Sequence, residues 1–283
     1  MKNLLTILTV LLFSFISISS YAISENKSKE QDNYVILLDL SDRMLNPNQA
    51  ELDKAVIMEC FEQFERHVKR HLYIKSKARF SVIIIPQKGV CYNIYDYNNK
   101  LSIDLSVITP AQKRKAVEQF SKKLSSLLNE LYKQAYQGSQ TSNYYGVDIW
   151  KYFYNQLSYD LLENYNNQII VLTDGYFDFE SHHNVKKQEN YFTSTQFFKF
   201  LSSNNWKQIS EKQNFGILPI TQKKFTKAHI TVIGISPKNE DLFEQEKLIY
   251  FWTKWVNDMH FKSIECIPLA GQTRVLQRMR KIL

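Results

Sequence analysis

The sequence predicts an α/β fold: a doubly wound, mostly parallel sheet of six strands with helices on both faces. Short apolar runs alternate along the chain with helical patterns of ten or more residues, and this alternation is typical of parallel sheets. Most of the runs are nearly continuous in apolar residues, as expected of strands covered on both faces. Residues 90–97 and 101–105 instead alternate around a turn at residues 98–99, which predicts a hairpin and one antiparallel edge strand.

The first half of the chain also predicts two buried strands and three helices. Residues 34–38 are an unbroken apolar run, and residues 47–73 follow with a proline at the start and apolar side chains at helical spacing. A proline halts the second run, residues 79–85, because proline cannot donate a hydrogen bond to a sheet. Residues 110–136 begin with a proline, which suits a first helical turn, and residues 146–165 also place their apolar side chains at helical spacing.

The second half continues the alternation of strands and helices. The predicted strands are residues 168–173, 229–235 and 263–269. The predicted helices are residues 241–259 and 272–283. The hairpin at residues 90–105 is counted as a single contribution to the sheet, the third strand, so the prediction is six strands in all.

An insertion of about residues 176–228 separates the fourth and fifth strands, with one helix predicted near residues 195–201. Its many aromatic residues argue against disorder, and a loop of this length in a compact domain is usually functional. Aromatic side chains are also favoured at interfaces. We therefore expect the insertion to contact a partner, to form a small core of its own, or both.

The N-terminal residues predict export. Lys2 precedes an apolar stretch, residues 4–18, and the small residues around Ala22 resemble a signal-peptide cleavage site. The stretch is shorter than the about 20 residues that a membrane-spanning helix needs. We expect residues 1–22 to be a cleaved signal peptide and the protein to be periplasmic or secreted. Retention in the inner membrane by an uncleaved segment is the alternative.

A flexible leader, residues 23–33, is predicted between the signal peptide and a single domain, residues 34–283. The formal net charge of +8 permits a weak attraction to acidic envelope surfaces. The basic residues are dispersed and belong to no nucleic-acid-binding module, so a nucleic-acid partner is not expected.

The cysteines and the paired histidines predict no metal site of their own. Cys60, Cys91 and Cys266 fit no zinc-site spacing and are expected to be small apolar residues with at most one disulfide. His182 and His183 are adjacent, without a second pair at ligand spacing, and are expected to be exposed loop residues.

Two aspartates follow strands whose carboxyl ends are expected at one edge of the sheet. Asp39 comes after residues 34–38, with Ser41 two positions later, and Asp174 and Gly175 come after the fourth strand. Ligands of open α/β sheets bind outside the carboxyl ends of the strands. Carboxylate and hydroxyl oxygens there suit a hard cation such as Mg²⁺.

These residues, in this order, resemble the metal-ion-dependent adhesion site of a von Willebrand factor A domain, and the resemblance extends from residue 34 to about residue 283. Asp39 and Ser41 match the start of that family's Asp-x-Ser-x-Ser loop, and Asp174 with Gly175 matches its Asp-Gly after the fourth strand. Thr141 is the candidate for its threonine from a second loop. The resemblance implies that these four residues, Asp174 directly or through water, hold Mg²⁺ or Mn²⁺, and that a protein partner's carboxylate completes the shell.

The final serine of that loop is replaced by Arg43. Three outcomes are open. Arg43 turns to solvent and water fills the vacant ligand position, or Asp42 turns inward and restores an oxygen ligand. In the third, Arg43 pairs with Asp39 or Asp174 and replaces the metal. The residues expected to contact a partner lie on the same edge and are Asp42, Arg43, Ser142, Gly175, Phe177 and Phe179.

The resemblance predicts a binding protein without a catalytic residue, and the signal peptide expected at residues 1–22 predicts that it is exported. A metal-free scaffold module is one alternative, and helix caps or turns are the local structural alternatives for Asp39, Ser41, Thr141 and Asp174. A Mg²⁺-dependent phosphatase-type hydrolase is another. That class needs a general acid where Ser41 stands, and a hydroxyl is a poor proton donor.

Overall fold

The computed structural model describes residues 30–179, 186–221, 225–239 and 241–283. The chain divides into two units, Met1–Gln31 and Asp32–Leu283, and the second contains the fold. The predicted signal peptide, residues 1–22, and most of the predicted leader lie outside the described residues, as do His182 and His183. No helix within the described ranges is both long enough and apolar enough to cross a membrane.

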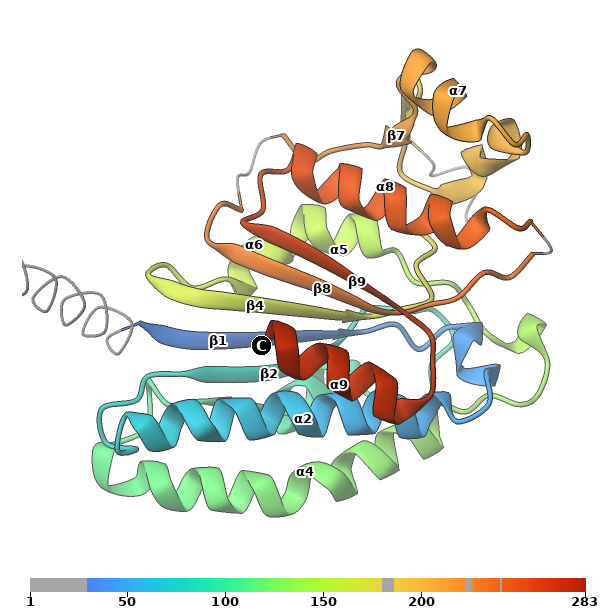
Figure 1. The fold of residues 1–283 in the computed structure, drawn as a ribbon. Helices are drawn as coiled ribbons and strands as arrows, with labels where there is room; N and C mark the ends of the chain where they lie inside the picture. Colours follow the sequence, from blue (N-terminus) through green and yellow to red (C-terminus); the bar gives the residue numbers. More distant parts are fainter. Residues whose placement is uncertain (1–29, 180–185, 222–224, 240) are drawn as a thin grey trace, which may run out of the picture. The chain divides into compact units, whose positions relative to one another are not determined.

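Six strands form the central sheet, which confirms the α/β prediction (Figure 1). Across the sheet the strands are, in order, β3 (Ser102–Asp104), β2 (Arg79–Ile84), β1 (Gln31–Leu38), β4 (Tyr165–Leu172), β8 (Ala228–Ile235) and β9 (Ser263–Pro268). The pairs β1–β2, β4–β8 and β8–β9 are parallel, whereas β2–β3 is antiparallel. The predicted antiparallel strand therefore lies at one edge.

Helices cover both faces of this sheet (Figure 1). One face carries α2 (Gln49–Arg70), α4 (Lys113–Ala135) and α9 (Gln272–Ile282), and the other carries α5 (Ile149–Asn155), α6 (Leu157–Asp160) and α8 (Glu244–Asp258). The period of two in a strand divides β1 between the layers. Tyr34, Ile36 and Leu38 belong to the core under α2 and α4, while Val35 and Leu37 belong to the core under α5 and α8.

The predicted strand at residues 90–97 is wrong, because the chain forms helix α3 (Ile94–Lys100) there. Asn93 caps the helix by accepting a hydrogen bond from the backbone N–H of Asp96 at 3.1 Å. Asn98 Oδ1, inside the helix, accepts from the N–H of Ile84 at 2.9 Å. Side-chain capping thus competes successfully with an apolar alternation too short to specify a strand.

The predicted helix at residues 146–165 is shorter and broken. Asp148 accepts a hydrogen bond from Lys151 N at 2.8 Å and caps α5, so the helix begins three residues later than expected. It is interrupted before α6, and β4 then begins at Tyr165. The three cysteines are free: Cys60 is buried, Cys266 is partly exposed and Cys91 is exposed.

The insertion is more ordered than the sequence indicates. It holds a small sheet and two helices, namely β5 (Lys187–Gln188), β6 (Tyr191–Phe192), β7 (Gly216–Ile217), the 3-10 helix η5 (Thr195–Leu201) and α7 (Trp206–Gln213). Phe197 stacks on Phe215 with ring centroids 5.9 Å apart and meets Phe251 of α8 edge-on at 4.8 Å. Among the described residues, the buried side chains of the insertion thus belong to the same core as β4, β8 and α8, and do not form a separate core of their own.

Candidate functional site

The two aspartates lie at the point where the connections of the sheet change direction. From β1 the chain continues to β2 on one side, and from β4 it continues to β8 on the other. This divergence opens a crevice at the carboxyl ends of the two central strands, where ligands of such sheets bind. Asp39 and Asp174 are both buried there, and the backbone N–H of Asp39 donates to Leu172 O at 3.1 Å.

The carboxylate of Asp39 is held by neutral donors on both sides. Its Oδ1 accepts from the backbone N–H of Ser41 at 3.0 Å, and its Oδ2 accepts from Thr173 Oγ1 at 2.8 Å. The first contact is a local turn, which matches the turn alternative for Asp39. Sequence reasoning missed Thr173, although its hydroxyl directly precedes Asp174 at the end of the fourth strand.

A lysine from a third loop lies against the acidic side chains at this edge of the sheet. Lys238, in the loop after β8, places Nζ 2.7 Å from Asp42 Oδ1 and 2.9 Å from Asp174 Oδ2. Its ammonium also lies 5.1 Å from the ring centroid of Tyr176, whose hydroxyl accepts from the backbone N–H of Lys238 at 2.8 Å. We call Asp39, Asp42, Asp174 and Lys238 the rim cluster.

The rim cluster shifts the pKa values of its own members. Burial and the neighbouring Asp39 raise the pKa of Asp174 from 3.8 to about 6, although Lys238 opposes the rise. Burial lowers the pKa of Lys238, but Asp174 and Asp42 outweigh it and raise that pKa overall. Burial and the repulsion between neighbouring carboxylates therefore disfavour the ionised form of Asp174, and the ammonium of Lys238 offsets part of this effect.

This raised pKa predicts a pH-dependent difference between wild type and Asp174→Asn. An acid whose pKa is higher in the folded than in the unfolded chain costs stability as pH rises from about 4 to about 6, because the folded state gives up its proton less readily. We expect Asp174→Asn to gain about 1–3 kcal/mol relative to wild type over this range. Urea unfolding of both proteins at the two ends of the range measures the gain, and a constant difference would contradict it.

Arg43 is buried beside Asp39 with its guanidinium directed at Asp53, and this burial contradicts its expected role as a partner contact. It is 2% exposed. Its guanidinium makes two hydrogen bonds to the Asp53 carboxylate, at 2.8 and 2.9 Å, and one to the backbone oxygen of Asp39 at 2.9 Å. Neither the turn to solvent nor the pairing with the carboxylates of Asp39 or Asp174 occurs, because Asp53 in α2 supplies the counter-charge.

Two further side chains and one glycine complete the surroundings of Arg43. Gln49 Nε2 and the Tyr132 hydroxyl donate to the same Asp53 carboxylate, at 2.8 and 2.9 Å. Gly234 of β8 permits the close approach, since a Cβ there would lie 3.2 Å from Arg43 Nη2. This network joins α2, α4 and the loop after β1, and its role is structural.

The remaining predicted partner contacts divide by exposure. Gly175 and Phe177 are buried, which contradicts their expected role: Trp252 Nε1 donates to Gly175 O at 2.8 Å, and the Phe177 ring lies 4.6 Å from that of Trp252. Asp42 and Phe179 are partly exposed.

The second-loop candidates are both at the surface. Thr141 and Ser142 are exposed in the 3-10 helix η3 (Thr141–Asn143). This helix lies close to η1 (Asp42–Leu45), which contains Asp42 of the rim cluster. The role of Thr141 as a metal ligand stays a prediction.

The donor set of the rim does not fit a divalent metal ion. Oxygen ligands for Mg²⁺ need free lone pairs directed at one point. Asp174 Oδ2 and Asp42 Oδ1 instead face the ammonium of Lys238, and both Asp39 oxygens accept from neutral donors. A cation would have to displace Lys238. No group of three or more His, Cys, Asp or Glu side chains suited to a metal occurs in the part of the chain that the structure describes.

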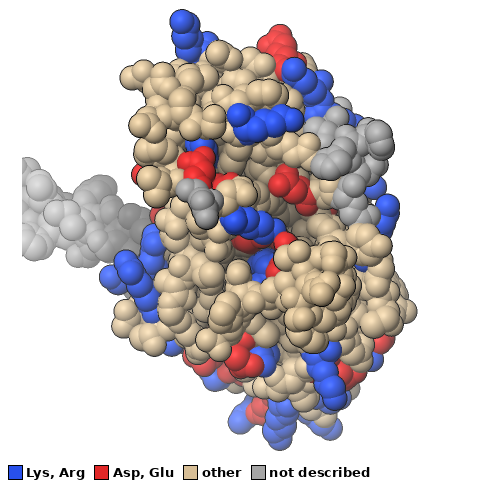
Figure 2. Space-filling model, turned by 90° about the vertical axis from the view of Figure 1, so that its right-hand side faces the viewer, with Lys and Arg blue, Asp and Glu red and all other residues tan. Residues whose placement is uncertain are grey.

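Figure 2 shows the carboxyl edge, where acidic and basic side chains meet in a hollow near the middle of the face. The arrangement can offer an incoming group both carboxylate acceptors and an ammonium donor. Comparison with protein-family models and with curated proteins gives no match. The chemistry of the site therefore rests on its own geometry.

Proposed function

We propose that this domain, which resembles a von Willebrand factor A domain, is a binding module whose carboxyl edge engages a protein partner without a divalent metal ion. One observation carries the proposal: the Lys238 ammonium lies between Asp42 Oδ1 and Asp174 Oδ2, at 2.7 and 2.9 Å. A positive charge from the chain itself thus takes the place that a metal ion would need.

The ammonium can still reach a partner. It has three N–H donors, two of its close neighbours are carboxylates of the rim, and the side chain is 42% exposed. The rim cluster holds three carboxylates against this one ammonium, so its charge favours a partner group that is neutral or positive. A partner carboxylate, the group implied by the sequence resemblance, would meet net repulsion here.

Apolar side chains on the same edge support a protein partner. Leu242, four positions after Lys238 in the loop that follows β8, is 92% exposed, and Tyr145, two residues after η3, is also exposed. Tyrosine is among the residues enriched at the hot spots of protein interfaces, so Tyr145 favours a protein partner at this edge. The export signal predicted at residues 1–22 would place such a partner in the periplasm or outside the cell.

Photo-crosslinking from the carboxyl edge tests this function. With a benzophenone amino acid at Leu242, we expect the full-length protein, expressed in cells, to crosslink to a discrete protein partner, equally with and without a metal chelator. The same label at Tyr159, exposed on α6 near the opposite end of the strands, is the control and should give none. Equal crosslinking from both positions, or loss of the Leu242 product with chelator, would contradict the proposal.

Titration with Mn²⁺ is the second arm of this test. We expect wild type and the surface control Lys122→Ala to give no binding heat, whereas Lys238→Ala frees the rim carboxylates and gains weak Mn²⁺ binding. Lys122 is exposed on α4, away from the rim. A wild-type heat that disappears in Asp39→Ala would restore the metal site and remove Lys238 from its role.

A further inference from the structure

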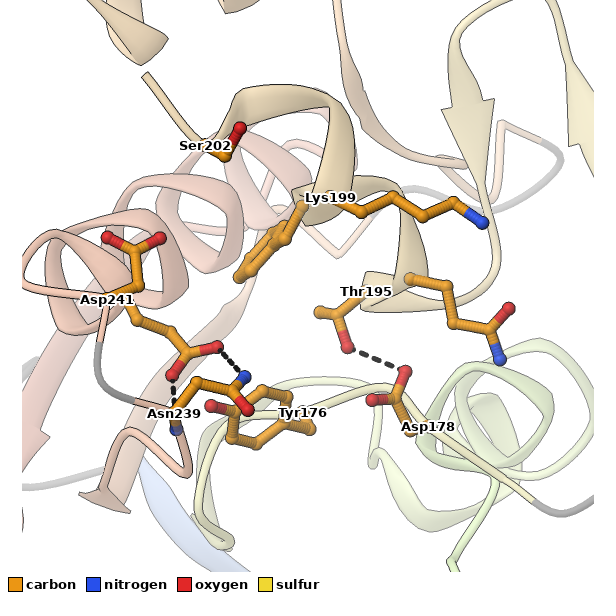
Figure 3. Close-up of a pocket in the computed structure, with 10 residues that line it drawn as sticks. Tyr176, Asp178, Thr195, Lys199, Ser202, Asn239 and Asp241 are labelled. Carbon is orange, nitrogen blue, oxygen red and sulfur yellow. Dashed lines mark hydrogen bonds between the residues drawn. The ribbon is translucent and has the colours of Figure 1, made fainter. Parts of the chain in front are cut away.

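A separate pocket lies beside the rim cluster, with a volume of about 290 Å³ (Figure 3). Three segments enclose it: the loop after β4, the 3-10 helix η5, and the loop that leads from β8 into α8. The lining residues that carry its chemistry are Tyr176, Asp178, Phe198, Asp241 and Glu244. Its volume lies near the lower end for ligand pockets, which suits a single side chain better than a large cofactor.

Two carboxylates of the pocket are held by neutral donors. Asp178 Oδ1 accepts from Thr195 Oγ1 at 2.8 Å, a bond drawn in Figure 3, and from Ser194 Oγ at 3.1 Å. The two oxygens of Glu244 accept from the backbone N–H and the Nδ2 of Asn239, at 2.9 and 2.6 Å. These bonds orient the two carboxylates, neither of which forms an ion pair with another residue that the structure describes.

The charge balance of the pocket is negative. Glu244 is 4% exposed, and the removal of an ionised carboxylate from water is costly without a counter-charge. Asp241 pairs with the buried Lys247. The ammonium of Lys199, the lysine that lines the pocket, lies 5.3 Å from the Phe200 ring centroid. An acidic hollow on a chain of net charge +8 is a local feature that attracts a cation.

Aromatic rings form part of the same lining. Tyr176 and Phe198 come from opposite sides of the pocket, one after β4 and the other in η5. A guanidinium or ammonium group gains further stabilisation over an aromatic face. Carboxylates and aromatic rings together are the combination that recognises a basic side chain.

We propose that this pocket binds an arginine or lysine side chain of the protein partner. The inference rests on the proposed function for the source of that side chain, and it agrees with the excess of carboxylates in the rim cluster. Asp178 is the residue that would contact the bound cation directly, because it is exposed and its hydrogen bonds come from hydroxyl groups.

The test uses capped amino acids as probes of the pocket. NMR titration of the full mature chain with Nα-acetyl-arginine amide and with Nα-acetyl-lysine amide should shift resonances of η5 and of residues 238–244. We expect at least one of the two to bind, with at least about tenfold loss of affinity in Asp178→Asn. The neutral Nα-acetyl-citrulline amide should not bind. Glu163→Gln, an exposed carboxylate change ahead of β4, is the control for a general loss of negative charge and should keep the wild-type affinity.

Each contrary outcome has a definite meaning. Equal binding of citrulline and arginine derivatives, an unchanged affinity in Asp178→Asn at unchanged melting temperature, or no binding at all would overturn the inference. Agmatine binding more than about tenfold tighter than both capped amino acids would identify a free amine as the ligand and also overturn it. The two proposals fail separately, because the Leu242 crosslink tests engagement of a partner at the carboxyl edge, whereas the capped amino acids test the pocket without any partner.

Discussion

Asp53→Ala is expected to lower the free energy of unfolding by about 3–5 kcal/mol, because it leaves a buried guanidinium without its counter-charge. Arg43 is almost fully buried, and Asp53 accepts both of its hydrogen bonds to a side chain. Gln49 and Tyr132 would lose their acceptor at the same time. Urea unfolding followed by circular dichroism at neutral pH measures the loss.

Two comparisons separate this pair from ordinary surface charges. The double variant Arg43→Met with Asp53→Leu should recover most of the lost stability, since apolar replacements of a buried ion pair are often neutral or better. Asp42→Ala removes a carboxylate of the partly exposed pair with Lys238 and should cost at most about 1 kcal/mol. A loss below about 1 kcal/mol in Asp53→Ala would mean that Arg43 does not depend on Asp53 and can direct its guanidinium at the rim cluster.

Trp252→Ala is expected to cost about 3–5 kcal/mol, the range for removal of a large buried aromatic side chain. Trp252 of α8 is 0% exposed, and its ring lies 4.6 Å from that of Phe177 and 5.5 Å from that of Trp255. Its indole N–H also holds the backbone oxygen of Gly175, next to Asp174. The variant should therefore lose both stability and the crosslink from the carboxyl edge.

Milder changes test the two parts of that effect. Trp252→Phe keeps much of the ring but leaves Gly175 O without its partner, and should cost about 1–3 kcal/mol. Tyr159→Ala, at an exposed aromatic residue of α6, should change stability by no more than about 0.5 kcal/mol. Equal losses of unfolding free energy in all three variants would contradict the stabilising role of the Trp252 ring and of its hydrogen bond to Gly175 O.

Several features of the fold could be predicted because they depend on local periodicity. The continuous apolar runs that became β1, β4 and β8 are buried on both faces, and this burial is what makes such runs recognisable. The meeting of Asp39 and Asp174 followed from the same runs, since parallel strands bring their carboxyl ends to one edge. The hairpin prediction failed at α3, where one cap residue outweighed a weak alternation.

The charges around the two aspartates could not be predicted, because they depend on residues far apart in the sequence. Asp42 and Lys238 are 196 positions apart, and the Asp53 carboxylate that neutralises Arg43 also binds Tyr132, 79 positions away. No short motif records such pairs. The sequence by itself determined the sheet and the acidic rim, since hydrophobic period and strand direction are local properties of the chain. Only the tertiary structure decided that the ammonium of Lys238, rather than the guanidinium of Arg43, faces that rim, because long-range packing selects which distant side chain compensates a buried charge.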